Sequence, residues 1–448
     1  MSEALPSDMN SSQHAGRASW VRWRIVALLM ALSFVSWFNR ANIAAAYTER
    51  IQYQVDISEK EIGAVGTAFF LVYALFMTPG GWFSDRFGTR LSLGLMGIGV
   101  GVFAALTGSA GLLFTNALPL LIAFFLVRSA MGVFATPMYP AGSRAVAEWF
   151  PFAQRAGANG LVQGAAPIGT ALTPLLFGHL MDRVDWPRAF ILTGAITGAV
   201  GILWLWYARS SPAKHPGVNR EELLRIQSGV TEFQAAETPS PRLEPGAWRR
   251  LLRNRNLVLL SVSYAAIGYF EYLFIFWTQH YFKEVRQVDV ETSRLYSSMT
   301  NLSMAAGMFL GGGLAAVLVR RFGARIGLVI VPIGGMLAGA VFLLIAIGAK
   351  EANWMVFWLC LAEAAVGSTE APQWTIAIEL GGRHGATAAG IFNTGGNIGG
   401  ALAPYGTPFI KDLFRGNWNA AIVASSIILL LGLSLWLWIN PRERVAES

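Results

Sequence analysis

Long uncharged apolar stretches recur along this chain, and they limit its possible folds more than any other feature. A helix rises about 1.5 Å per residue, so about 20 mainly apolar residues cross a hydrocarbon layer of about 30 Å. Continuous runs of this length favour helices, because the strands of a membrane barrel would show about ten-residue segments of alternating polarity. The predicted spans are residues 23–47, 62–84, 91–110, 117–141, 158–180, 188–208, 256–281, 296–319, 326–348, 353–379, 386–410 and 418–440.

Composition supports an all-α membrane protein of twelve transmembrane helices, surrounded by a lipid bilayer. Charged residues make up 13% of the chain, against roughly 25% in soluble proteins. The single cysteine, Cys360, excludes an internal disulfide or a CxxC metal site. The chain has no phosphate-binding loop and no basic soluble domain. We therefore expect no metal, no cofactor, no enzymatic activity and no nucleic-acid partner, and a gradient as the energy source.

The distribution of lysine and arginine predicts the orientation. These residues concentrate in the N-terminal tail, in the even-numbered connections and at the C-terminus, which the positive-inside rule assigns to the cytoplasm. Residues 1–19 lack the apolar core of a cleavable signal, so they are predicted to form a disordered cytoplasmic tail. Residues 441–448 are predicted to form a second cytoplasmic tail. We expect a monomer in a bacterial inner membrane with both termini cytoplasmic.

A polar, proline-containing stretch divides the chain into two parts. Residues 209–255 are predicted to form a cytoplasmic linker with a short amphipathic helix at 220–227. The linker separates a six-helix bundle at residues 20–208 from another at 256–440.

The two bundles are internal repeats. Three pairs of segments match across the linker, the first two at an offset of 235 and the third at 230: residues 86–90 with 321–325, 132–137 with 367–372, and 168–174 with 398–404. Parallel six-helix repeats are the plan of the major facilitator transporters, in which the cargo site lies near mid-membrane between the halves.

A loop motif strengthens this resemblance. Residues 81–90 read GWFSDRFGTR, which resembles the superfamily signature G-x-x-x-D-R-x-G-x-R between helices 2 and 3. In that family the motif forms a cytoplasmic latch that holds the halves in one state. Loop charges that only enforce topology would explain the arginines but not the Gly and Asp. The predicted gating residues are Asp85, Arg86, Arg90, Arg321 and Arg325.

Within the superfamily, the chain is similar to the anion:cation symporters, which include transporters of D-galactonate, glucarate, hexuronates and sialic acid. The resemblance covers nearly the whole chain and is carried by residues 37–40, Tyr73 with the following 79–81, residues 128–151, and the linker at 215–226. It implies that Tyr73, Gln163 and Asn393 are cargo-binding residues.

Two positions depart from the D-galactonate-type pattern. In those transporters an Asp precedes the helix 1 arginine and a Glu stands in a G-x-x-E-A-P motif of helix 4, and both take up protons. Here the positions hold Asn39 and Ala135, and neither side chain can titrate.

Arg40 and Arg128 are the two arginines well inside the predicted hydrocarbon spans, away from their ends. A charged residue at a helix centre costs roughly 2.5–3.5 kcal/mol on insertion scales, so an arginine without a role is not expected there. A guanidinium holds a carboxylate through two parallel hydrogen bonds and stays charged. We predict that at least one of them binds a small organic anion; the alternative is a structural ion pair inside the bundle.

Three acidic residues lie well inside predicted spans of the second half, away from their ends: Glu271, Glu363 and Glu370. Glu370 is the repeat partner of Ala135 and shares one face of its helix with Glu363 and Trp374. We hypothesise that Glu370, with Glu271, carries the coupling proton as its surroundings change between states. A permanent salt bridge between the halves is the alternative.

The repeat also predicts the polar lining of the cargo site. Gln163 pairs with Asn393 at an offset of 230, and Tyr139 with Trp374 at 235, so each pair should face the central axis from opposite halves. Amides and aromatic rings suit the hydroxyl groups and the C–H faces of a sugar acid, whereas hydrogen bonding between helices would use the same residues. Asn39, Tyr139 and Asn397 are secondary candidates.

Together these features predict a secondary transporter of a sugar acid, such as a hexonate, aldarate or hexuronate, that works by alternating access with proton-coupled uptake. An anion exchanger or uniporter without proton coupling is the first alternative. A transporter-like sensor would need a larger cytoplasmic domain than this linker, and an exporter of cationic drugs would not place two arginines at mid-membrane.

Overall fold

The computed structural model describes residues 18–227, 247–381 and 385–440. Nearly all of the predicted tail at 1–19, and the whole predicted tail at 441–448, lie outside these residues. The side chains of Asp85 and Arg325 are also outside the described part. Within it the regular structure is entirely helical, as the composition predicts.

The first half contains seven helices that cross or partly cross the bundle, together with a π-helical turn and the three-residue helix α2. These elements are α1 (Val21–Ala46), η1 (Tyr47–Ile51), α2 (Gln52–Gln54), α3 (Glu59–Phe87), α4 (Thr89–Leu113), α5 (Ala117–Ala135), α6 (Met138–Trp149), α7 (Phe152–Val184) and α8 (Trp186–Tyr207). The connecting segment holds η2 (Pro212–Lys214), α9 (Arg220–Gln227) and α11 (Ala247–Arg253). The second half contains α12 (Arg255–His280), η3 (Tyr281–Val285), α13 (Val290–Phe322), α14 (Ala324–Gly348), α15 (Ala352–Gly367), α16 (Glu370–Gly381), α17 (Gly385–Leu413), α18 (Trp418–Ser434) and η5 (Leu435–Leu437).

These elements confirm the predicted twelve-helix architecture, because α5 with α6 and α15 with α16 each form one broken crossing. Among the described residues, 10 helices are long and apolar enough to span a membrane by themselves. The other two crossings are the α15–α16 pair, whose parts have 16 and 12 residues, and α17, which carries Pro404, Pro408 and many glycines.

The repeat seen in the sequence is also present in local geometry. Gly88 and Gly323 end α3 and α13 with φ of 82° and 83°, a backbone conformation that residues with a Cβ rarely adopt. Each glycine lets one helix stop and the next begin in the opposite direction, which explains why both repeats keep it. The π-helical turns η1 and η3 likewise occupy matching places at the ends of α1 and α12.

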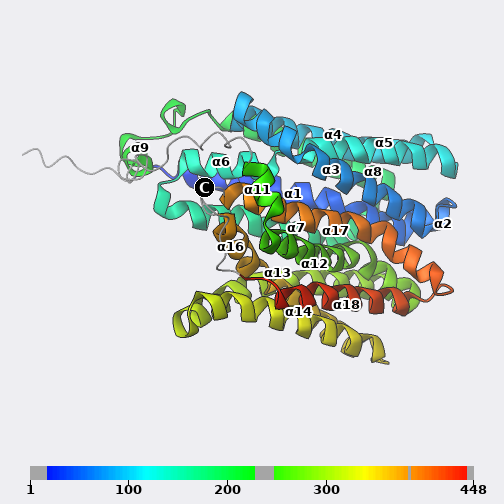
Figure 1. The fold of residues 1–448 in the computed structure, drawn as a ribbon. Coiled ribbons are helices and arrows are strands. Elements are labelled where there is room, and N and C mark those ends of the chain that lie inside the picture. The colour runs from blue at the N-terminus through cyan, green and yellow to red at the C-terminus, as the bar shows by residue number, and fades with distance from the viewer. Residues whose placement is uncertain (1–17, 228–246, 382–384, 441–448) are drawn as a thin grey trace, which may run out of the picture.

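The two halves lie side by side, with α4 and α5 at one edge of the molecule and α14 at the other (Figure 1). Within the halves α1 packs on α7 and α12 on α17, while α3 packs on α17 and α7 on α13 across the boundary. We call the end that holds α9, α11 and the last described residues the linker side, and the end that holds α2 the far side (Figure 1). The core site therefore has to lie between α1, α3, α7 and their partners α12, α13, α17.

The short helix predicted at 220–227 is confirmed as α9, and it is fastened to the first half. Glu222 is fully buried and accepts hydrogen bonds from the backbone N–H groups of Val21 and Arg22 at 3.3 and 3.1 Å. The carboxylate thus caps the start of α1. His215 packs against Trp149, and its burial lowers the pKa of the ring.

Candidate functional site

A cavity of about 780 Å³ lies between the two halves, within the roughly 300–1,000 Å³ usual for small-molecule sites. Its walls come from α1, α3, α6 and α7 on one side and α12, α13, α16 and α17 on the other. Most of the lining is apolar or aromatic. The charged side chains in the described lining are Arg40, Glu271 and Glu370.

Arg40 is the group best suited to bind an anion. Its residue is 2% exposed, and none of its three guanidinium nitrogens has a hydrogen-bond partner among the described residues. The guanidinium carbon lies 4.6 Å from the ring centre of Trp37 and 4.3 Å from that of Tyr73. These rings hold the cation in place without using its donors, so the donors remain available to a guest.

Arg128 occupies a different place from the one expected for an anion-binding residue. It does not line the cavity, and its Nη2 donates to the backbone carbonyl oxygen of Arg40 at 2.9 Å. Its Nη1 donates to Asn42 Oδ1 at 3.3 Å. No carboxylate of the described residues pairs with it, so the predicted ion pair is absent here. In this geometry Arg128 positions the helix turn that carries Arg40.

The two glutamates of the lining come from the second half. Glu370, the first residue of α16, accepts hydrogen bonds at Oε2 from Tyr264 Oη at 2.7 Å and Trp374 Nε1 at 3.2 Å. Its Oε1 is buried without a partner. Glu271 of α12 makes no hydrogen bond or ion pair with a described residue. A permanent salt bridge from either glutamate to Arg40 or Arg128 is therefore not formed in this state.

The structure brings most of the predicted cargo-binding residues to one cavity. Those that line it are Arg40, Tyr73, Tyr139, Gln163, Trp374, Asn393 and Asn397. Trp37 was not predicted; its indole N–H donates to Tyr139 Oη at 2.7 Å, and its place three residues before Arg40 is the signal that could have found it. Asn39 is fully buried instead, with its amide on Thr197 Oγ1 at 2.8 Å. It packs α1 against α8, as the alternative of helix-to-helix hydrogen bonding had allowed.

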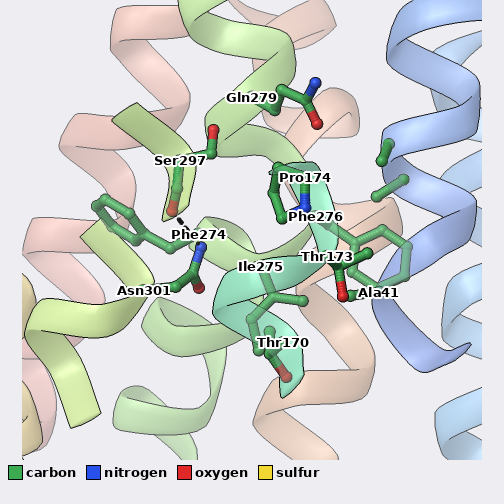
Figure 2. A pocket seen from close by; sticks show the side chains of 12 residues that line it. Ala41, Thr170, Thr173, Pro174, Phe274, Ile275, Phe276, Gln279, Ser297 and Asn301 are labelled. Carbon is green, nitrogen blue, oxygen red and sulfur yellow. Dashed lines mark hydrogen bonds between the residues drawn. The ribbon is translucent and has the colours of Figure 1, made fainter. Parts of the chain in front are cut away.

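The floor of the cavity closes toward the far side. Thr170, Ile275 and Asn301 line both the cavity and a void of only about 10 Å³ beyond it, roughly the space of one water molecule. Figure 2 shows side chains from both halves around this void, with the amide of Asn301 directed at Ser297. A sugar-sized molecule cannot pass this point in the present state.

Beyond the floor, a buried ion-pair cluster joins the halves. Arg294 of α13 donates from Nη2 to Glu49 Oε2 at 2.6 Å and from Nε to Glu49 Oε1 at 2.9 Å. Asp182 of α7 accepts from Arg294 Nη1 at 2.5 Å, and Gln279 donates to Glu49 Oε1 at 2.5 Å. The side chains of Arg294 and Glu49 are 1% and 0% exposed. The buried pair of Arg294 and Glu49 holds the far side shut, since separating the two side chains would leave a buried charge without its partner.

A second cluster extends this closure. Glu59 accepts from His280 Nε2 at 3.0 Å and from Lys411, and Lys60 pairs with Asp412 at 2.9 Å. Every ion pair between described residues of the two halves lies at the far side. From the floor, the lining of the cavity extends toward the linker side, through Gly160 of α7 and Ala389 of α17.

Sequence reasoning missed these far-side pairs, because Glu49 and Arg294 fall just outside the predicted spans. A signal was present in the repeat. Glu49 and Glu284 stand at the same offset of 235 as the loop motif, and Glu284 also reaches across the boundary, accepting from Gln52 Nε2 at 3.0 Å and from Tyr53.

The predicted gating residues make contacts within their own halves. Arg90 donates to the carbonyl oxygen of Leu205 at 3.0 and 2.6 Å, Arg86 lies over the rings of Trp82 and Phe87, and Arg321 is exposed. No ion pair between described residues joins the halves at the linker side, and the side chains of Asp85 and Arg325 lie outside the described part, so the gating role of this motif stays a prediction.

The Major Facilitator Superfamily model matches residues 29–404 of the chain. Three curated relatives are similar over nearly their full length. A probable sulfoacetate transporter of Cupriavidus necator is 28% identical, with 94% of each chain covered. A probable galactarate/D-glucarate transporter of Bacillus subtilis is 27% identical, covering 98% of this chain and 97% of the relative. A D-galactonate transporter of Escherichia coli is also 27% identical, covering 98% and 100%.

Solved structures confirm the fold. A bacterial homologue of the human lysosomal transporter Spinster superposes with a TM-score of 0.75 at 17% identity, over 96% of this chain and 100% of that one. A D-xylose-proton symporter gives a TM-score of 0.69 at 14% identity, over 95% and 99%. At these identities the likeness concerns the arrangement of the helices alone.

Proposed function

The chain belongs to the Major Facilitator Superfamily and is a secondary membrane transporter, not an enzyme, and from this premise we propose that its cargo is a sugar-acid anion held by Arg40. The unpartnered guanidinium in a cavity between the halves is the observation that carries the proposal. A buried cation without a counter-charge is costly, and an anionic guest with a planar carboxylate would neutralise it through two hydrogen bonds.

The rest of the lining suits a hydroxylated cargo. Gln163 and Asn393 present amide groups from opposite halves, and Asn397 adds a third. Tyr73 and Trp374 supply aromatic faces against which the C–H side of a sugar acid can pack. Two of the relatives are named as transporters of galactarate and D-glucarate or of D-galactonate, and these names support the same class of cargo.

Transport then requires the cavity to close alternately at the far side and at the linker side. In the present state the far-side ion pairs hold the halves together and the cavity opens to the linker side, which we assign to the cytoplasm from its positive charge. Rocking of the halves about the cargo would break the far-side pairs and close the linker side. The two copies of the loop motif lie at that side, where Gly88 and Gly323 end α3 and α13 with nearly the same positive φ.

We assign proton coupling to Glu370, with Glu271. Both residues line the cavity, and neither carboxyl group forms an ion pair with a basic side chain of the described residues. Their surroundings would change when the halves rock, and a change of surroundings shifts the affinity of a carboxyl group for a proton. Anion exchange without protons is the second candidate. It is favoured by Asn39 and Ala135, because neither side chain can take up a proton.

Uptake by proteoliposomes tests the proposal. The purified chain should accumulate a labelled hexonate or hexuronate when an inward proton gradient is imposed, and unlabelled sugar acids should compete whereas benzoate-type acids should not. Counterflow of the same anion without a gradient, together with no response to an imposed one, would favour exchange. Failure of every anion in both assays would overturn the proposed function.

A further inference from the structure

The charges around the cavity are arranged unequally. Arg40 is the sole basic side chain in its described lining, and it stands on the wall formed by the first half. Both acidic side chains, Glu271 and Glu370, stand on the wall formed by the second half. A cargo that places its anionic group on Arg40 and crosses the cavity therefore points its other end toward two carboxyl groups.

The described residues offer no second cation to that other end. Arg128, the remaining arginine at this depth, uses its guanidinium on the carbonyl oxygen of Arg40 and on Asn42. The donors nearest the two glutamates, the Tyr264 hydroxyl and the Trp374 indole N–H, are already directed at Glu370 Oε2. The charged groups that this wall offers the cargo are therefore Glu370, whose Oε1 has no partner among the described residues, and Glu271, beside the neutral amides of Asn393 and Asn397.

We propose that this site selects monoanions whose other end carries hydroxyl groups, and that it rejects dianions of the same length; this inference rests on the proposed function. A hydroxyl group can donate to an ionised carboxylate and accept from a protonated one, so it fits the glutamates before and after a proton moves. A second carboxylate on the cargo would be repelled by the ionised form and would fit only the protonated one. It would thus hinder release of the proton.

The relatives do not decide this point. A galactonate ion carries one carboxylate, whereas galactarate, glucarate and sulfoacetate each carry two acidic groups, and transporters of both kinds are similar to this chain at 27–28% identity. The distribution of charge in the cavity is what assigns the chain to the first kind.

D-galactonate and galactarate form a matched pair for the test, because they share the configuration of their four central carbons and differ only in a terminal CH₂OH or carboxylate. Dissociation constants of the full-length purified chain are measured by isothermal titration calorimetry at neutral pH. We expect galactonate to bind more tightly than galactarate by at least about tenfold. Glu271→Gln removes one carboxylate from the wall without disturbing a hydrogen bond, and it should reduce that preference several-fold.

Glu379→Gln is the matched control, since it makes the same change on the exposed side of α16 and should leave the preference as in wild type. Galactarate binding as tightly as galactonate, or a preference equally reduced in both variants, would overturn the inference while leaving the proposed function in place. Binding of neither compound, nor of any other sugar acid, would overturn the proposed function and this inference with it.

Discussion

Replacing Arg40 with glutamine should remove most of the affinity for anionic cargo, and the structure sets the size of the loss. None of the three guanidinium nitrogens has a hydrogen-bond partner among the described residues, so a carboxylate can take two charge-assisted hydrogen bonds, each worth about 1.5–3 kcal/mol. Losing both costs about 3–6 kcal/mol, which corresponds to roughly a hundredfold to ten-thousandfold weaker binding. Arg40→Lys keeps the charge but loses the planar fork, and its loss should be about the size of one such bond.

The assay is isothermal titration calorimetry with D-galactonate on purified protein. Because the Arg40 side chain makes no hydrogen bond with the described residues and lies over the rings of Trp37, Phe69 and Tyr73, the cargo-free variant should remain folded. Arg188→Gln, at an exposed position near the start of α8, is the matched control and should bind as wild type does. A dissociation constant for Arg40→Gln within about threefold of the wild-type value would refute the assignment of the anion to this guanidinium.

Three further outcomes are expected. Arg128→Gln leaves the buried carbonyl oxygen of Arg40 without its donor. The free energy of unfolding should fall by about 1–3 kcal/mol, seen as a lower melting temperature, and the affinity for cargo should fall with it. Lost affinity at unchanged stability would instead indicate that Arg128 contacts the cargo directly. Glu370→Gln should make uptake insensitive to an imposed pH gradient while counterflow persists, and an unchanged proton dependence would end that assignment. Arg294→Gln breaks the buried pair with Glu49 and should weaken far-side closure by about 3–5 kcal/mol, seen as longer distances between spin labels across the far side; an unaltered distance distribution would contradict the closing role.

The fold was predictable because two strong signals agree. Twenty-residue apolar runs leave little choice besides helices in a bilayer, and the offset of 235 between residues 86–90 and 321–325 shows that the halves are copies. The same offset predicted that Tyr139 and Trp374 would face one cavity from opposite halves, and both line it.

The details of the charged residues were less predictable, since they depend on which side chains meet in three dimensions. Arg40 and Arg128 look equivalent in sequence, but the guanidinium of Arg128 donates to the carbonyl oxygen of Arg40. Arg128 therefore positions Arg40, whereas the guanidinium of Arg40 faces the cavity. The bond between Glu49 and Arg294 joins residues 245 positions apart, and charges near helix ends are ordinarily solvated. The pair is buried where η1 and α7 of the first half meet α13 of the second.

The most direct measurement is a structure of the full chain with D-galactonate bound. The carboxylate of the cargo should lie against the guanidinium of Arg40, within hydrogen-bonding distance of at least two of its nitrogens, with the hydroxylated end directed toward Glu271 and Glu370. Cargo density elsewhere in the cavity, with the Arg40 nitrogens still unpartnered, would contradict the claim that this arginine is held free for an anionic guest.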